Sequence, residues 1–136
     1  MTALLAWNPT IGGRGTTPDE VLYQYAEAIA SVCESDIECL TMASIASEES
    51  HFAPSVLSGE CNRTRHRCDH GQAYGAWQMH QFSSTSLDML HTGINEQAAI
   101  VVKLYRKMPY AWTTHRIAEY KARKWLREHP IELAKE

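Results

Sequence analysis

Hydrophobic side chains recur every three or four residues between positions 17 and 33. The apolar set comprises Val21, Leu22, Tyr25, Ala28, Ile29 and Val32, a spacing that places them on one face of a helix. The run opens with Thr17-Pro18-Asp19-Glu20. A hydroxyl cap, a proline in the first turn and two acids near the positive end of the helix dipole all favour a helix start. The pattern therefore predicts a helix that ends near Cys33.

A second helical pattern begins at Asp36, whose side-chain oxygen can cap the helix. Pro54 cannot continue this helix, so we expect it to end at Ser50 or His51. Small and apolar residues form its stripe, namely Ile37, Leu40, Ala43, Ser44 and Ser47, with Met42 and Ile45 beside it. Small side chains permit close packing, which predicts a position in the centre of a helical bundle.

The rest of the chain divides into a polar segment and a helical part. Residues 53–77 are polar and rich in arginine and glycine. A segment of this length in a compact domain is usually functional or contains a small sheet. The later apolar spacing predicts three further helices, at about 84–91, 95–108 and 113–128. The predicted fold class is therefore mainly α, with a long loop or small β-hairpin.

Composition indicates one globular domain. A chain of 136 residues with 44% hydrophobic and 21% charged side chains can bury a single core. We assign that domain to residues 17–136 and an N-terminal arm to 1–16, whose glycine cluster does not suit a helix or strand interior. No apolar run approaches the roughly 20 residues of a membrane helix, so membrane insertion is not expected. The segment 1–7 lacks the basic flank of a signal peptide.

Charge is distributed unevenly along the chain, although the net charge is only −3. Residues 1–60 carry one basic and nine acidic side chains, whereas residues 61–136 carry twelve basic and seven acidic ones. The basic set includes Arg116, Lys121, Arg123, Lys124 and Arg127. These residues indicate either a solvated helix face or a surface that steers an anionic polymer. A pI near 6.1 and the lack of a reader motif argue against a nucleic-acid partner.

The four cysteines fall into two local pairs, Cys33 with Cys39 and Cys61 with Cys68. Two short disulfides would close these rings and would indicate an oxidising compartment. Reduced core thiols are one alternative. Zinc is another, because His66 and His70 flank Cys68, but the spacings lack the paired clips of structural zinc sites. We therefore predict disulfides Cys33–Cys39 and Cys61–Cys68, and no metal.

Two short motifs suggest the chemistry. The first, Ser47-Glu48-Glu49-Ser50-His51-Phe52, places carboxylic acids at the end of an apolar helical run. The second, Asp69-His70-Gly71-Gln72-Ala73-Tyr74-Gly75-Ala76-Trp77-Gln78, is a glycine-containing turn with aromatic and amide groups, which suits a sugar cleft. In order and separation the two motifs resemble the Glu-Ser and Gly-Leu-Met-Gln motifs of lytic transglycosylases and goose-type lysozymes. The likeness covers roughly positions 40–80.

This resemblance implies a lysozyme-like domain that cleaves the β-1,4 bond between N-acetylmuramic acid and N-acetylglucosamine in peptidoglycan. Residues 53–77 would then form the cleft floor. Glu49 would be the general acid, because it directly precedes Ser50, while Glu48 lies about 100° further round the helix and can be solvated. No cofactor is implied. The expected partner is a glycan strand and the expected location extracytoplasmic, with virion or secretion-machinery association as delivery routes.

The resemblance also implies roles for other side chains, each with a structural alternative. Ser50 would orient the acid or its water, or be an ordinary helix-end residue. Gln78 would bind a sugar N-acetyl group, or bridge its own turn. Tyr74 would stack on a sugar ring, or pack in the core. Tyr120, in a loose match to an Ala-Tyr-Asn motif, would bond the acid's carboxyl, or pack as a helical core tyrosine.

Asp69 decides between two reaction types. It resembles one of two acids that position water in goose-type lysozymes, or it bonds Arg67 or caps its loop. The second acid is replaced by His80, which slightly favours lytic transglycosylation over hydrolysis. A different class remains open: a non-catalytic wall-binding or virion structural module that keeps the fold. The altered Gly75-Ala76-Trp77-Gln78 motif supports that class and Glu49 opposes it.

Overall fold

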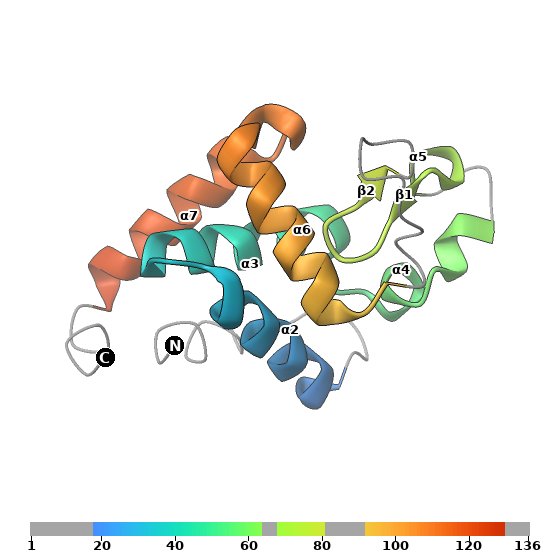
Figure 1. The fold of residues 1–136 in the computed structure, drawn as a ribbon, viewed down its shortest axis with the longest axis horizontal. Coiled ribbons are helices and arrows are strands. Elements are labelled where there is room, and N and C mark those ends of the chain that lie inside the picture. The colour runs from blue at the N-terminus through green and yellow to red at the C-terminus, as the bar shows by residue number, and fades with distance from the viewer. Residues whose placement is uncertain (1–17, 64–67, 81–91, 130–136) are drawn as a thin grey trace.

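The computed structural model describes residues 18–63, 68–80 and 92–129, and helices account for most of them (Figure 1). The predicted N-terminal arm and the helix expected at 84–91 lie outside these residues. The long helices are α2 (Asp19–Val32), α3 (Asp36–Ser50), α6 (Ile94–Lys107) and α7 (His115–Glu128). A two-stranded sheet accompanies them. The mainly α class is confirmed, and all four long helices begin and end within about two residues of the predicted positions.

Helix α3 occupies the centre of the described fold. Every residue from Cys39 to Ala46 is buried, so this helix is covered all round rather than on one face. The cap differs from our prediction, because Ser35 Oγ accepts the Glu38 N–H at 3.2 Å. Asp36 is instead the first helical residue, where a negative charge is favourable beside the helix dipole. The helix ends at Ser50, as predicted.

The other long helices pack around α3. Helix α7 lies beside it, and the start of α7 meets the end of α3, so the two run antiparallel (Figure 1). Helix α2 packs mainly against α6. In the first turn of α3, Glu38 Oε1 accepts a hydrogen bond from Arg106 Nη2 of α6 at 2.6 Å. This bond to Arg106 lowers the pKa of Glu38. The ion pair therefore holds α6 to α3 while Glu38 is ionised, and this contact weakens when the pH falls through the lowered pKa of Glu38.

The polar segment after α3 folds into short elements that include the expected hairpin. Strand β1 (Ala73–Tyr74) pairs antiparallel with β2 (Met79–His80), with Ala73 opposite His80. The second strand lies beyond position 77, where the predicted segment ended. Before the hairpin the chain forms a short helix, a 3₁₀ turn and another short helix, namely α4 (Pro54–Leu57), η1 (Glu60–Arg63) and α5 (Cys68–Gly71).

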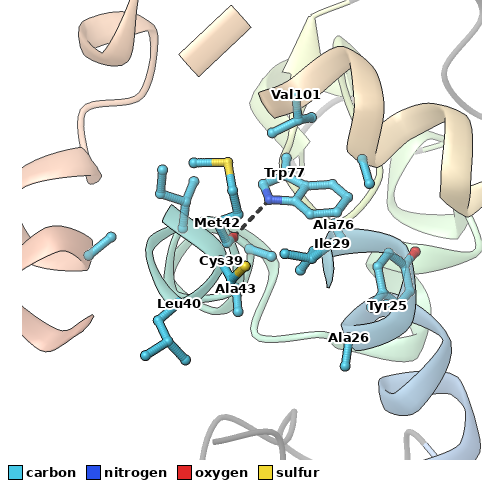
Figure 2. Close-up of a cluster of buried hydrophobic side chains, with 14 of the residues drawn as sticks. Tyr25, Ala26, Ile29, Cys39, Leu40, Met42, Ala43, Ala76, Trp77 and Val101 are labelled. Carbon is cyan, nitrogen blue, oxygen red and sulfur yellow. Dashed lines mark hydrogen bonds between the residues drawn. The ribbon is translucent and has the colours of Figure 1, made fainter. Parts of the chain in front are cut away.

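Trp77, in the hairpin turn, fixes the hairpin to the core (Figure 2). Its side chain is 1% exposed, and its indole Nε1 donates to the Met42 carbonyl on α3 at 2.9 Å. The ring also lies 5.8 Å from that of Tyr25 on α2. Val101 of α6 belongs to the same buried cluster and is drawn above the Trp77 ring in Figure 2. One aromatic side chain thus ties the hairpin to two helices, α3 and α2.

Two disulfides join the cysteines in the predicted pairs. Cys33 bonds to Cys39 with a Cα–Cα distance of 5.3 Å, and Cys61 bonds to Cys68 at 5.9 Å. The first links the end of α2 to α3, and the second links η1 to α5. The cysteine sulfurs are therefore used in covalent bonds and are not thiolate ligands. Within the described ranges, no helix combines the length and apolarity needed to cross a membrane.

Gly75 is the position in the hairpin turn where a side chain should be tolerated least. Its φ is +76°, and a Cβ atom there would lie 2.8 Å from Gln97 Oε1. We expect Gly75→Ala to lower the free energy of unfolding by about 2 kcal/mol, since a left-handed backbone costs an L-residue about 1–2 kcal/mol before any clash. Urea titration followed by circular dichroism measures this.

The matched control is Gly93→Ser. Gly93 precedes α6 with a φ of −64°, and a Cβ atom at this position would lie 3.8 Å from its nearest neighbour, Glu96 Oε2. Serine is a favourable residue before a helix, so this variant should be as stable as the parent. Equal stability of the two variants would show that the Gly75 turn adapts.

Candidate active site

Glu49 lies in the last turn of α3 and contacts the start of α7. Its side chain is half-buried, and its Oε2 accepts a hydrogen bond from Thr114 Oγ1 at 2.6 Å. Thr114 occupies the cap position of α7, yet its side chain makes no capping bond to that helix. A threonine hydroxyl at this position usually accepts from the helix's own backbone. Here it is directed at the carboxylate of another helix instead.

Glu48 has a different environment from its neighbour. Its carboxylate forms an ion pair with the ammonium of Lys121, in the second turn of α7. The ammonium can only donate hydrogen bonds, whereas a threonine hydroxyl can both donate and accept. Thr114 can therefore hold Glu49 in place in its ionised and its protonated form. Of the two adjacent acids, Glu49 has the partner that suits a residue exchanging a proton.

Ser50 stabilises the end of α3. The side chain is 2% exposed, its hydroxyl donates to the Ala46 carbonyl at 2.8 Å, and its Oγ accepts the Phe52 N–H at 3.1 Å. His51 and Phe52 both have positive φ, 52° and 51°, so the chain turns sharply after the helix. The structure places Ser50 in a backbone role, which fixes the helix end that carries Glu49.

The two hairpin residues proposed to bind sugar lie in different surroundings. Tyr74, on β1, is half-buried and packs against the hydrophobic core. Gln78 follows Trp77 with a φ of +51°, and its Nε2 donates to the Gly75 carbonyl at 2.9 Å. Its amide nitrogen thus bridges its own turn, the structural alternative considered for this residue, while the side chain is still partly exposed.

Asp69 and His80 form a pair that joins α5 to the end of β2. His80 Nε2 lies 3.0 Å from Asp69 Oδ2, and the two side chains are 35% and 55% exposed, His80 being the less exposed. The sequence indicated that His80 stands where a second acid was expected. In the structure, His80 contacts Asp69, the first of the two expected acids. Arg67, the alternative partner of Asp69, lies outside the described residues.

Two tryptophans connect the hairpin to the start of α7. Trp112 is 4% exposed, and its Nε1 donates to the Trp77 carbonyl at 2.8 Å. Trp112 lies two residues before Thr114, and Trp77 directly precedes Gln78. This bond therefore brings the second motif to the same region as the partner of Glu49. Sequence reasoning missed both Trp112 and Thr114, because neither belongs to a motif and Thr114 reads as an ordinary helix cap.

Tyr120 lies on the protein surface rather than in the core. Its side chain is 59% exposed on α7, and the hydroxyl that reaches Glu49 belongs to Thr114 instead. A different tyrosine bonds a carboxylate nearby: Tyr105 on α6 donates to Glu119 on α7. Burial, followed by this bond, raises the pKa of Tyr105. The Tyr105–Glu119 contact fastens α6 to α7.

The described residues contain no cluster of three or more histidine, cysteine, aspartate or glutamate side chains that could hold a metal ion. The structure brings together the Glu49 carboxyl and the Thr114 hydroxyl at the end of α3 and, separately, the Asp69 and His80 side chains beside the hairpin. No protein-family model, curated protein sequence or solved structure matches this chain significantly.

Proposed function

We propose that this chain is a peptidoglycan-degrading muramidase with a lysozyme-like fold, in which Glu49 is the general acid. The observation that carries the proposal is the contact between Glu49 and Thr114 at the junction of α3 and α7. It supports the motif-based choice of Glu49 over Glu48, whose carboxylate is paired with Lys121. The two disulfides are compatible with an extracytoplasmic location.

In the proposed reaction, Glu49 donates its proton to the glycosidic oxygen as positive charge develops on the sugar ring. Thr114 then donates to the carboxylate that is left, so the side chain keeps its position through the cycle. In transglycosylation the same carboxylate next removes the proton from the 6-hydroxyl of the muramic acid. That oxygen attacks the anomeric carbon and closes a 1,6-anhydro ring, so no water is consumed.

The pairing of Asp69 with His80 slightly favours transglycosylation over hydrolysis. Inverting hydrolysis needs a base roughly 6.5–9.5 Å from the acid, with a water held between the two groups. The Asp69 carboxylate already accepts a contact from the His80 ring at 3.0 Å, so it does not have both oxygens available for a water. A single-acid mechanism through Glu49 needs neither residue as a base.

A second candidate is a non-catalytic wall-binding or virion structural module. The observation in its favour is that two side chains expected to serve the sugar are bonded within the protein. The Ser50 hydroxyl bonds backbone atoms on both sides, and the Gln78 amide nitrogen bonds Gly75. A turbidity assay on purified cell walls separates the two classes, because a binding module leaves the walls intact.

Mass analysis of digested peptidoglycan tests the reaction type. We expect 1,6-anhydro-muramyl products, which are one water lighter than hydrolysed ones. Asp69→Asn should lower the rate only modestly, far less than the roughly 10²–10⁴-fold of a lost general acid, because it weakens the contact to His80 and leaves Glu49 in place. Reducing-end products that disappear in Asp69→Asn would instead establish hydrolysis with Asp69 as the water-positioning base.

A further inference from the structure

The exposed face of α7 carries a straight row of side chains that the proposed reaction does not use. Arg116, Tyr120, Arg123 and Arg127 follow one another at i, i+4, i+7 and i+11. At 100° per residue these four positions fall within an arc of about 60°, and at 1.5 Å per residue the row is about 16 Å long. All four side chains are exposed. We call them the arginine row.

Within the part of the chain that the structure describes, the arginine row takes no part in the ion pairs that occupy other cations. Lys121 is paired with Glu48 and Arg106 with Glu38. None of the three row arginines has an ion-pair partner among residues 18–63, 68–80 and 92–129. Helix α7 carries two acids, Glu119 and Glu128. Glu119, which lies between Arg116 and Arg123 in the sequence, accepts a hydrogen bond from the Tyr105 hydroxyl. The guanidinium groups therefore present their donors to solvent.

The opposite side of α7 explains why the row faces outward. Ala118, Ala122 and Trp125 are buried, and α3 packs against this side of the helix (Figure 1). Tyr120 is 59% exposed and Ile117 47% exposed, so the outward face also offers apolar surface. An exposed aromatic ring between arginines can contact the uncharged part of a ligand while the arginines bind its charges.

We propose that the arginine row is a docking surface for a linear phosphodiester polymer that lacks bases, such as poly(glycerol phosphate). Guanidinium groups match phosphate oxygens with two parallel hydrogen bonds, which a lysine row would not offer. Helix α7 carries five basic and two acidic side chains, a local charge of +3 in a chain of net charge −3. The acidic remainder repels a broad polyanion such as a duplex, so a thin chain along the helix fits better. This proposal goes beyond the proposed muramidase activity and does not depend on it.

Fluorescence anisotropy with labelled poly(glycerol phosphate) and the full chain tests the row. Three phosphate contacts predict that affinity falls about 20-fold between about 50 and 200 mM salt, from a slope near 0.7 per contact on a single strand. The triple variant R116Q/R123Q/R127Q should bind at least about tenfold more weakly at low salt and lose most of that slope. Tyr120→Ala, which removes no charge, should weaken binding and leave the slope unchanged.

The matched control removes the same number of charges elsewhere. Arg63, Lys103 and Lys107 are exposed and lie off α7, so R63Q/K103Q/K107Q should bind nearly as the parent does. Equal weakening in both triple variants would overturn the proposal, because net charge alone would explain binding. Tighter binding of single-stranded DNA, or equal binding of polyglutamate, would overturn the choice of a base-free phosphodiester. Circular dichroism confirms that each variant is folded.

Discussion

Glu49→Gln is expected to reduce cell-wall cleavage by about 10²–10⁴-fold, the range over which general acid catalysis usually contributes. The amide keeps the shape of the side chain and can still accept the Thr114 hydroxyl, observed at 2.6 Å in the parent. It has no proton of suitable acidity to give to the glycosidic oxygen. Initial rates of turbidity loss on purified walls measure the effect, and thermal unfolding confirms that the variant is folded.

Glu48→Gln is the matched control, since it makes the same chemical change one residue away. It removes a partly exposed ion pair with Lys121, of a kind usually worth about 1 kcal/mol or less, and should keep most of the activity. Thr114→Val should give an intermediate loss, because Glu49 would keep its proton but lose the hydroxyl that holds it. If Glu48→Gln were inactive and Glu49→Gln active, the catalytic acid would be Glu48.

Trp77→Ala should be the most destabilising single change in the described core. The indole is 1% exposed, donates to the Met42 carbonyl at 2.9 Å and contacts Tyr25. Truncating a buried tryptophan typically lowers the free energy of unfolding by about 3–5 kcal/mol. That is a large share of the roughly 5–15 kcal/mol that stabilises an ordinary domain. Urea titration followed by circular dichroism measures the loss.

Two further variants test whether the stability lost in Trp77→Ala comes from the buried position of the ring or simply from the loss of an aromatic side chain. Trp77→Phe keeps a ring in the core but loses the Nε1 donor, so we expect it to be more stable than Trp77→Ala. Tyr110→Ala removes an aromatic ring that is 68% exposed, and should change stability by about 0.5 kcal/mol or less. A loss below about 1 kcal/mol in Trp77→Ala would mean that the hairpin is not held by this contact.

The long helices could be predicted from the sequence because their determinants are local. Apolar spacing indicated α2, α3, α6 and α7, and Pro54 set the end of α3 near the correct residue. The disulfides were predictable for the same reason, since each pair closes a short ring. The cap of α3 was misassigned because Ser35 and Asp36 are both good capping residues, and their order along the chain does not decide between them.

The candidate site required tertiary structure, because its contacts join residues far apart in sequence. The sequence determined a carboxylic acid at the end of a central helix and a glycine-containing turn after it. It did not determine that Thr114 would turn its hydroxyl from its own helix to Glu49, or that Trp112 would bond Trp77. Those contacts depend on the antiparallel packing of α7 against α3, which no local propensity encodes. The same packing leaves Tyr120 exposed, although the motif resemblance had implied that its hydroxyl bonds the acid.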